Sequence, residues 1–244
     1  MTKAGGSPGL RRNGWSLWLG WVLANSLAET VGLGVSFGMG AGLFQYLQAP
    51  GIITALATTG AAVLSGTLIE GTAVGTAPWL VLRRRIPNMH WHAWTLATAA
   101  GALVAWTLGM LPGTLMGAQS AGPAPAEPPD SIVYVLAAVM GLVGGTILGT
   151  PQWIVLRRHI RRAGVWVPAN ALAWVPGMVL AFVAADVLFS SDIGLMSILV
   201  AVFILVLIGA VVGAIHGAVL VWLLGSNNRK GGTVIRQPES MRNQ

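Results

Sequence analysis

All fourteen Lys and Arg residues of the chain fall into four short clusters, and this distribution limits the possible folds more than any other feature. The clusters lie at residues 3–12, 83–85, 157–162 and 229–242. Between consecutive clusters lie apolar stretches of roughly 70 residues, and a membrane-spanning helix needs about 20. Because cationic loops stay on the cytoplasmic side of a bilayer, the pattern predicts six transmembrane helices with both termini cytoplasmic.

The composition independently indicates an all-α integral membrane protein, which we expect in the cytoplasmic (inner) membrane. The chain is 55% hydrophobic and 9% charged, with a mean hydropathy of +0.72. About a quarter of the residues in a soluble domain are charged. The net charge of +7 sits beside the expected helices, so it favours anionic lipid headgroups over nucleic acid as the partner. Without cysteine there is no disulfide and no thiolate ligand.

The expected organisation is a cytoplasmic tail, a membrane domain of three hairpins and a flexible cytoplasmic tail. The apolar run from Trp15 to about Leu47 is too long for a cleavable signal peptide, so the first helix is retained. The expected helices cover about 21–45, 51–82, 91–117, 131–156, 166–189 and 195–224. The tails cover 1–14 and 225–244, and the membrane domain at 15–224 contains hairpins 15–82, 91–156 and 166–224.

The three hairpins resemble one another in sequence. Their first helices align without gaps as WVLANSLAETVG from Trp21, HWHAWTLATAAG from His90 and WVPANALAWVPG from Trp166. Their second helices align as GTAVGTAPWLVLRRR from Gly71, GTILGTPQWIVLRRH from Gly145 and, more loosely, GAIHGAVLVWLLGSN from Gly213. Since all three enter the membrane from the same side, the repeats are parallel and related by a pseudo-threefold axis along the membrane normal.

Each second helix carries two glycines four residues apart, which share one helix face and permit close backbone approach. The pairs are Gly71 and Gly75, Gly145 and Gly149, and Gly213 and Gly217. These glycines predict a packing seam used three times. The functional alternative is that the helices shift against each other along this seam.

Two of the second helices end in similar motifs, Trp79 to Arg84 and Trp153 to Arg158, with Gln152 before the second Trp. This ending resembles multi-pass bacterial membrane proteins that carry repeated Gln-Trp-x-Val-Leu-Arg-Arg hairpins. The resemblance implies a fold and no activity. Pro78 stands at the Gln position of the first hairpin, and the third hairpin lacks the arginines.

Polar residues within the expected helices are the candidates for function. Glu29 lies about 12 Å into the hydrocarbon layer, where a lone carboxylate is costly. His216 comes out at nearly the same depth when counted from Gly225, so we predict a Glu29–His216 pair in the bundle interior. Asn25, Asn170 and Gln152 lie nearer the inner boundary. They either line the same polar layer or cross-link helices.

Glu70 lies about 20 Å from the inner boundary and is either a neutral carboxyl bonded across helices or a proton-exchanging site. Its depth differs from that of Glu29 by about 8 Å, which argues against a paired-carboxylate protease. Ten of the eleven tryptophans, all but Trp106, lie near the inner boundary and are expected to form mainly an interfacial belt.

Two functions remain open on the sequence. The first is a bundle that translocates a proton, an ion or a small solute through a polar path lined by inward-facing residues: Glu29, His216, Glu70, Asn25, Asn170 and Gln152. The second is a non-catalytic structural or accessory subunit of a larger respiratory or photosynthetic complex, with much of its Gly and Trp content facing outward toward other helices, pigments or lipids. No catalytic or phosphate-binding motif is present, so we expect no enzyme activity, no metal and no cofactor.

Overall fold

A computed structural model of the protein describes residues 8–47, 51–118, 128–188 and 194–231, and all regular secondary structure in these ranges is helical. The helices are α1 (Pro8–Leu47), α2 (Ile52–Ser65), η1 (Gly66–Glu70), α3 (Gly71–Leu82), α4 (Trp91–Ala118), α5 (Asp130–Leu156), η2 (Ala163–Val165), α6 (Trp166–Leu188) and α7 (Leu195–Gly231). Residues 119–127, between the expected helices 91–117 and 131–156, and residues 232–244 of the expected tail lie outside the described residues.

Six helical segments are long and apolar enough to cross a membrane, so the number of crossings agrees with the prediction. α1 begins at Pro8 instead of Trp21, and α7 continues to Gly231 instead of ending near Leu224. Both helices therefore extend into segments that were expected to be tails.

The second crossing is a continuous helix with one wide turn inside it. α2, η1 and α3 follow one another without a break, and η1 is a π-helical turn in which the N–H of Gly71 donates to the carbonyl of Gly66. The extra residue lets the inward face pass from Gly66 to Glu70 and Gly71, all three of which are buried. Such turns occur often at functional sites.

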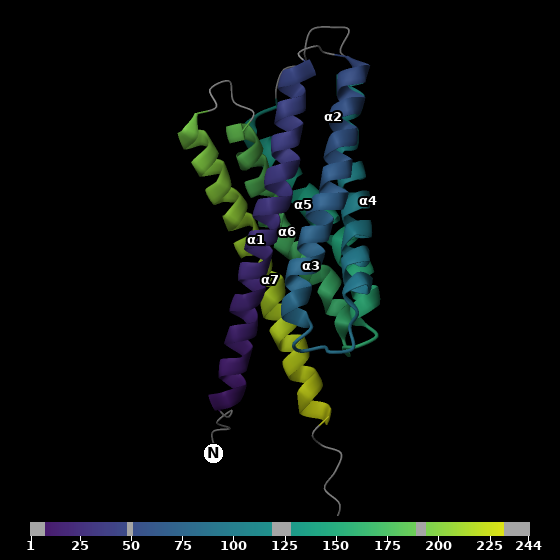
Figure 1. Ribbon diagram of the computed structural model, residues 1–244, viewed down its shortest axis with the longest axis vertical. Helices are drawn as coiled ribbons and strands as arrows, with labels where there is room; N and C mark the ends of the chain where they lie inside the picture. Colours follow the sequence, from purple (N-terminus) through teal and green to yellow (C-terminus); the bar gives the residue numbers. More distant parts are fainter. Residues whose placement is uncertain (1–7, 48–50, 119–127, 189–193, 232–244) are drawn as a thin grey trace, which may run out of the picture.

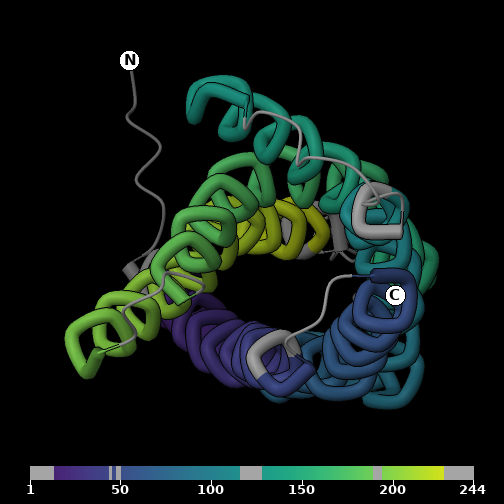
Figure 2. Tube along the Cα trace, turned by 90° about the horizontal axis from the view of Figure 1, so that it is seen from above, coloured from purple at the N-terminus to yellow at the C-terminus, as the bar shows by residue number. Residues whose placement is uncertain are grey.

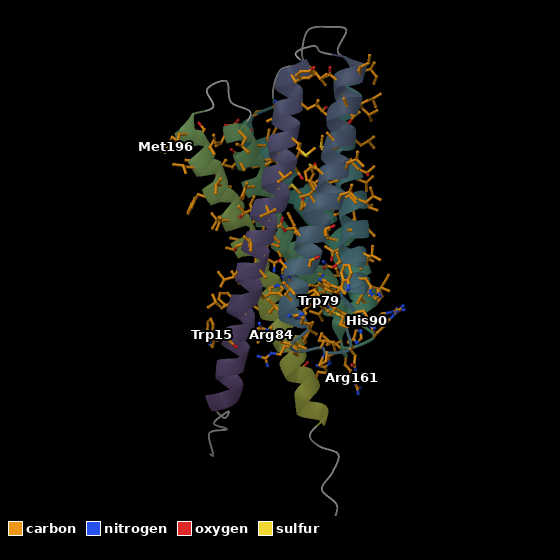
Figure 3. All side chains as sticks on the ribbon, in the orientation of Figure 1. Trp15, Trp79, Arg84, His90, Arg161 and Met196 are labelled. Carbon is orange, nitrogen blue, oxygen red and sulfur yellow. The ribbon has the colours of Figure 1, made fainter. Side chains whose placement is uncertain are left out.

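The six crossings form a ring, as the end-on view shows (Figure 2). Going around the ring, α1 contacts α2 and α3, α3 contacts α4, α4 contacts α5, α5 contacts α6, α6 contacts α7, and α7 returns to α1. The start of α1 and the end of α7 lie at the same end of the bundle (Figure 1). Arg84 and Arg161 also lie toward this end, whereas Met196 lies toward the other (Figure 3). We call it the arginine end.

Two apolar clusters stabilise the ring. The first lies toward the arginine end and combines Trp21, Trp94 and Trp166 with Leu82, Ile86, Met89, Leu156, Ile160, Ala163, Leu220 and Leu223. The second is formed by α1, α6 and α7 and contains Leu33, Ala173, Trp174, Ala181, Ala184, Ile204, Leu205, Ile208 and Val212. Large apolar side chains on the outer surface, among them Leu23, Leu27 and Leu64, are exposed, as expected for a lipid-facing wall.

Candidate functional site: a polar cavity inside the ring

A small cavity of about 20 Å³ lies inside the ring and is lined by residues from all six crossings. This is room for a water-sized molecule. The six polar residues predicted from the sequence all line it, and all are buried: Asn25, Glu29, Glu70, Gln152, Asn170 and His216. The ring thus brings together side chains that are as far as 191 positions apart in the chain.

Glu29 is the most unusual group in this cavity. Its side chain is 0% exposed, and neither carboxyl oxygen has a hydrogen-bond partner. Removing an ionised carboxylate from water costs several kcal/mol unless it is paired. Among the residues that the structure describes, no Lys or Arg lines the cavity. Glu29 therefore requires a proton or a cation supplied from outside the protein chain.

Glu70 has a protein partner, in contrast to Glu29. The indole Nε1–H of Trp106 donates to its Oε2 at 2.9 Å. Gly66, one turn before Glu70, makes room for this indole, since a Cβ at Gly66 would overlap the Trp106 ring. The π-helical turn and Gly66 together position Glu70 toward the cavity. Trp106 was not among the candidates, although its depth set it apart from the other ten tryptophans.

Glu29 and Glu70 line the same cavity. The backbone explains this arrangement, because a Cβ at Gly32 would lie 2.6 Å from the Cα of Glu70. Gly32 is one helical turn beyond Glu29, so α1 and η1 touch at the level of the two carboxyl groups. The expected difference in depth therefore does not keep the two side chains apart.

A layer of tryptophans borders the cavity toward the arginine end. Trp21, Trp94 and Trp166 are each 1% exposed, so they belong to the core and not to the expected interfacial belt. The ring centroids of Trp21 and Trp166 are 5.9 Å apart, and those of Trp94 and Trp166 are 6.0 Å apart. Edge-to-face pairs of this kind stabilise cores beyond their buried area.

Side chains on neighbouring helices accept hydrogen bonds from two of these indoles. Trp21 Nε1–H donates to His216 Nδ1 at 2.8 Å, and Trp166 Nε1–H donates to Gln152 Oε1 at 2.9 Å. Gln152 also donates from Nε2 to Thr98 Oγ1 at 3.0 Å. Gln152 on α5 therefore links α4 to α6. The indole N–H of Trp94 has no acceptor, although it is buried.

The predicted Glu29–His216 pair is wrong as a direct contact. His216 Nδ1 accepts from Trp21, and both Glu29 oxygens are unpartnered. The depth of His216 was counted from Gly225, but α7 continues to Gly231, so helix length did not give its position. His216 packs beside Trp21, which lies eight residues before Glu29 in α1, or about 12 Å along the helix.

The two asparagines bond within their own helices. Asn25 Nδ2 donates to the carbonyl of Trp21 at 2.8 Å, and Asn170 Nδ2 donates to the carbonyl of Trp166 at 3.0 Å. Thr98 Oγ1 donates to the carbonyl of Trp94 in the same i to i−4 manner. These side chains therefore do not cross-link helices by the bonds they donate, and all three line the cavity.

The six predicted packing glycines lie where neighbouring helices approach closely. A Cβ at Gly71 or Gly75 would meet α4, one at Gly145 or Gly149 would meet α6, and one at Gly213 or Gly217 would meet α1. A Cβ at Gly75 would lie 2.8 Å from the Cα of Thr95, one at Gly149 would lie 3.2 Å from the Cα of Val167, and one at Gly213 would lie 3.1 Å from the Cα of Val22. Gly209, not predicted, makes a similar contact to the Cα of Ser26 at 2.5 Å.

The fold and the cavity define the class of the protein: a multi-pass membrane protein whose buried polar residues converge inside a helical ring. No protein-family model, curated protein or solved structure matches the chain. Among the described residues, no group of three or more His, Cys, Asp and Glu side chains is placed to hold a metal ion. The polar side chains that line the cavity carry carboxyl, amide, imidazole, indole and hydroxyl groups.

Proposed function

We propose that the protein translocates protons, or another cation of about the size of water, and that Glu29 carries the cation in the middle of the path. The observation that carries this proposal is the unpartnered, fully buried carboxyl group of Glu29 in a cavity that every crossing lines. A buried acidic residue within a membrane segment is typical of proton and ion pathways.

The charge and the size of the solute follow from the residues that line the cavity. Within the described parts of the chain, two carboxyl groups and no Lys or Arg face the cavity, so it attracts cations and repels anions. A volume of about 20 Å³ admits a water-sized species and nothing larger without rearrangement. The proton fits best, because no cluster of metal-ligating side chains is present among the described residues.

The proposal includes a three-hairpin architecture with both termini in the cytoplasm, at the inner membrane. Support comes from three equivalent interfaces, α3 with α4, α5 with α6, and α7 with α1, in which a glycine faces the residue after a buried tryptophan. In this architecture Trp94, not His90, corresponds to Trp21 and Trp166, and Gly209, not Gly213, corresponds to Gly71 and Gly145. Small residues recur every fourth position, so the sequence alone matches both registers.

Movement of the cation requires the ring to open to each side in turn. One apolar cluster lies on the arginine-end side of the cavity, and the other packs around Leu33 and Trp174 on the opposite side. The arrangement is that of an occluded state. In this proposal the helices shift along the three glycine seams, where glycine lets neighbouring backbones approach closely.

The test is proton flux in liposomes that contain the purified protein and a trapped pH dye, driven by a potassium–valinomycin potential. We expect wild-type protein to conduct and Glu29→Gln to lose the flux. The matched control is Asp186→Asn, which removes an exposed carboxyl group near the end of α6 and leaves the cavity unchanged. Equal flux in wild type and Glu29→Gln contradicts the role of Glu29.

The accessory-subunit alternative is favoured less by where the glycines and tryptophans lie in the fold. It expects much of the Gly and Trp content to face outward, yet the six predicted packing glycines contact neighbouring helices and Trp21, Trp94 and Trp166 are buried. Absence of flux in every variant, at either polarity of the potential, favours this alternative, and co-purification from native membranes then identifies the partners.

A further inference from the structure

The three buried tryptophans lie at three equivalent helix contacts, but the indole N–H has a hydrogen-bond acceptor at only two of them. Each tryptophan is followed by a residue that faces a glycine of the neighbouring helix, namely Val22 at Gly213, Thr95 at Gly75 and Val167 at Gly149. The residue three positions after each of these glycines has the side chain that would meet the indole of the facing tryptophan. These side chains are His216, Pro78 and Gln152.

His216 and Gln152 accept the indole N–H groups of Trp21 and Trp166. Pro78 has no acceptor on its side chain, and the Trp94 N–H is buried without a partner. A buried donor without an acceptor is rare in folded proteins, because it loses its hydrogen bond to water on folding. The unpartnered indole is therefore a local consequence of proline at position 78.

Pro78 removes a second hydrogen bond at the same place. Proline has no backbone N–H, so within α3 the carbonyl of Val74 lacks the donor that residue 78 would ordinarily supply. Val74, Pro78 and Trp94 all line the cavity. One buried donor and one helix carbonyl without its usual partner thus occur on facing helices.

We propose that this α3–α4 contact binds a water molecule, which accepts from Trp94 Nε1–H and donates to the carbonyl of Val74. The cavity has room for it, and buried water is found where two or more polar groups lack protein partners. The corresponding contacts at Trp21 and Trp166 are closed by direct hydrogen bonds and stay dry.

The water also completes a route to Glu29, a role that rests on the proposed function. Its second lone pair accepts a proton arriving from the arginine end, and it releases one of its own protons toward the carboxylate of Glu29. The water is regenerated, so one proton enters and one leaves. The proton then crosses the layer of three tryptophans at the Trp94 contact and not at the other two.

The site is tested by NMR on protein with 15N-labelled tryptophan in nanodiscs, measuring magnetisation transfer from water to each indole N–H. The Trp94 signal is assigned by its loss in Trp94→Phe. We expect transfer to Trp94 and none to Trp21 or Trp166. A Trp94 signal as protected from water as the other two overturns the proposal, whatever the flux measurement gives.

A second experiment supplies the missing acceptor. Pro78→Gln places an amide where α5 has Gln152 and also restores the backbone N–H for Val74. We expect loss of the water transfer to Trp94 and loss of proton flux although Glu29 is unchanged. Pro112→Gln, at an exposed proline within α4, is the control and is expected to change neither.

Pro78→Ala separates the two effects, since it restores the backbone donor without an acceptor for Trp94. We expect this variant to keep water at the indole. Normal flux in Pro78→Gln with the water signal gone would remove the relay role and leave the water site. Absent flux in wild type with the Trp94 water signal present would refute the proposed function alone.

Discussion

The contact between Gly32 and Glu70 gives the sharpest test of how the ring is packed. A Cβ at Gly32 would lie 2.6 to 2.7 Å from the Cα, Cβ and Cγ of Glu70. Because backbone is among these atoms, Gly32→Ala must push α1 away from η1. Overpacking of this kind costs about 1–3 kcal/mol. The same replacement gains up to about 1 kcal/mol in helix propensity, which partly offsets the cost.

Gly38→Ala is the matched control, because Gly38 lies in the same helix and has no atom within 4 Å of its would-be Cβ. The propensity gain is common to both variants and cancels in their difference. The two should therefore differ in the free energy of unfolding by the overpacking cost of about 1–3 kcal/mol. For a chain of this length that is a difference in Tm of about 2–12 °C.

The assay is thermal unfolding in one detergent, followed by circular dichroism, with Gly32→Ala, Gly38→Ala and wild type measured side by side. We expect Gly38→Ala to unfold at or slightly above the wild-type temperature and Gly32→Ala to unfold below Gly38→Ala. Equal midpoints for the two variants would show that α1 and η1 do not touch at Glu70. The argument that the two carboxyl groups share one cavity would fail with it.

Three further predictions concern other contacts. Trp106→Phe removes the donor to Glu70 and should lower the free energy of unfolding by about 1–3 kcal/mol, measured by denaturant titration; no change would mean that the bond is not formed. Gln152→Leu leaves the Trp166 indole without an acceptor and should lower the free energy of unfolding by a similar amount in the same titration. Gln152→His should recover part of this loss, because the imidazole of His216 accepts the corresponding hydrogen bond from Trp21. The chain has no cysteine, so single cysteines report topology: Arg161→Cys should react with an impermeant maleimide from the cytoplasmic side and Ser131→Cys from the outside, and the reverse pattern would invert the proposed orientation.

The sequence predicted the crossings well because lipid imposes simple rules. Apolar length and the placement of arginines depend on each segment separately, so 91–156 was divided into two helices within a few residues of α4 and α5. The ends of α1 and α7 were missed because a helix continues into water when nothing terminates it. Neither Pro8 nor Gly231 follows from hydropathy.

The candidate polar residues were also recognisable, since Glu29, Glu70 and His216 are costly in hydrocarbon wherever they point. Their partners were not recognisable. Trp106 reaches Glu70 only because Gly66 and a π-helical turn rearrange the second crossing, and periodicity in the sequence does not reveal a single wide turn. Trp21, Trp94 and Trp166 appeared interfacial by depth, but depth does not say whether a side chain faces lipid or the ring interior.

The sequence by itself determined that the described part of the chain contains six segments long and apolar enough to cross a membrane, because the apolar length of a segment needs no knowledge of its neighbours. Only the tertiary structure decided which helices touch and in which register. That register puts Glu29 and Glu70 in one cavity, lets His216 accept the hydrogen bond from Trp21, and leaves the Trp94 indole N–H without an acceptor among the described residues. Register depends on contacts of a few ångströms between helices distant in sequence, and glycines and alanines that recur every fourth residue allow several registers until the side chains are packed.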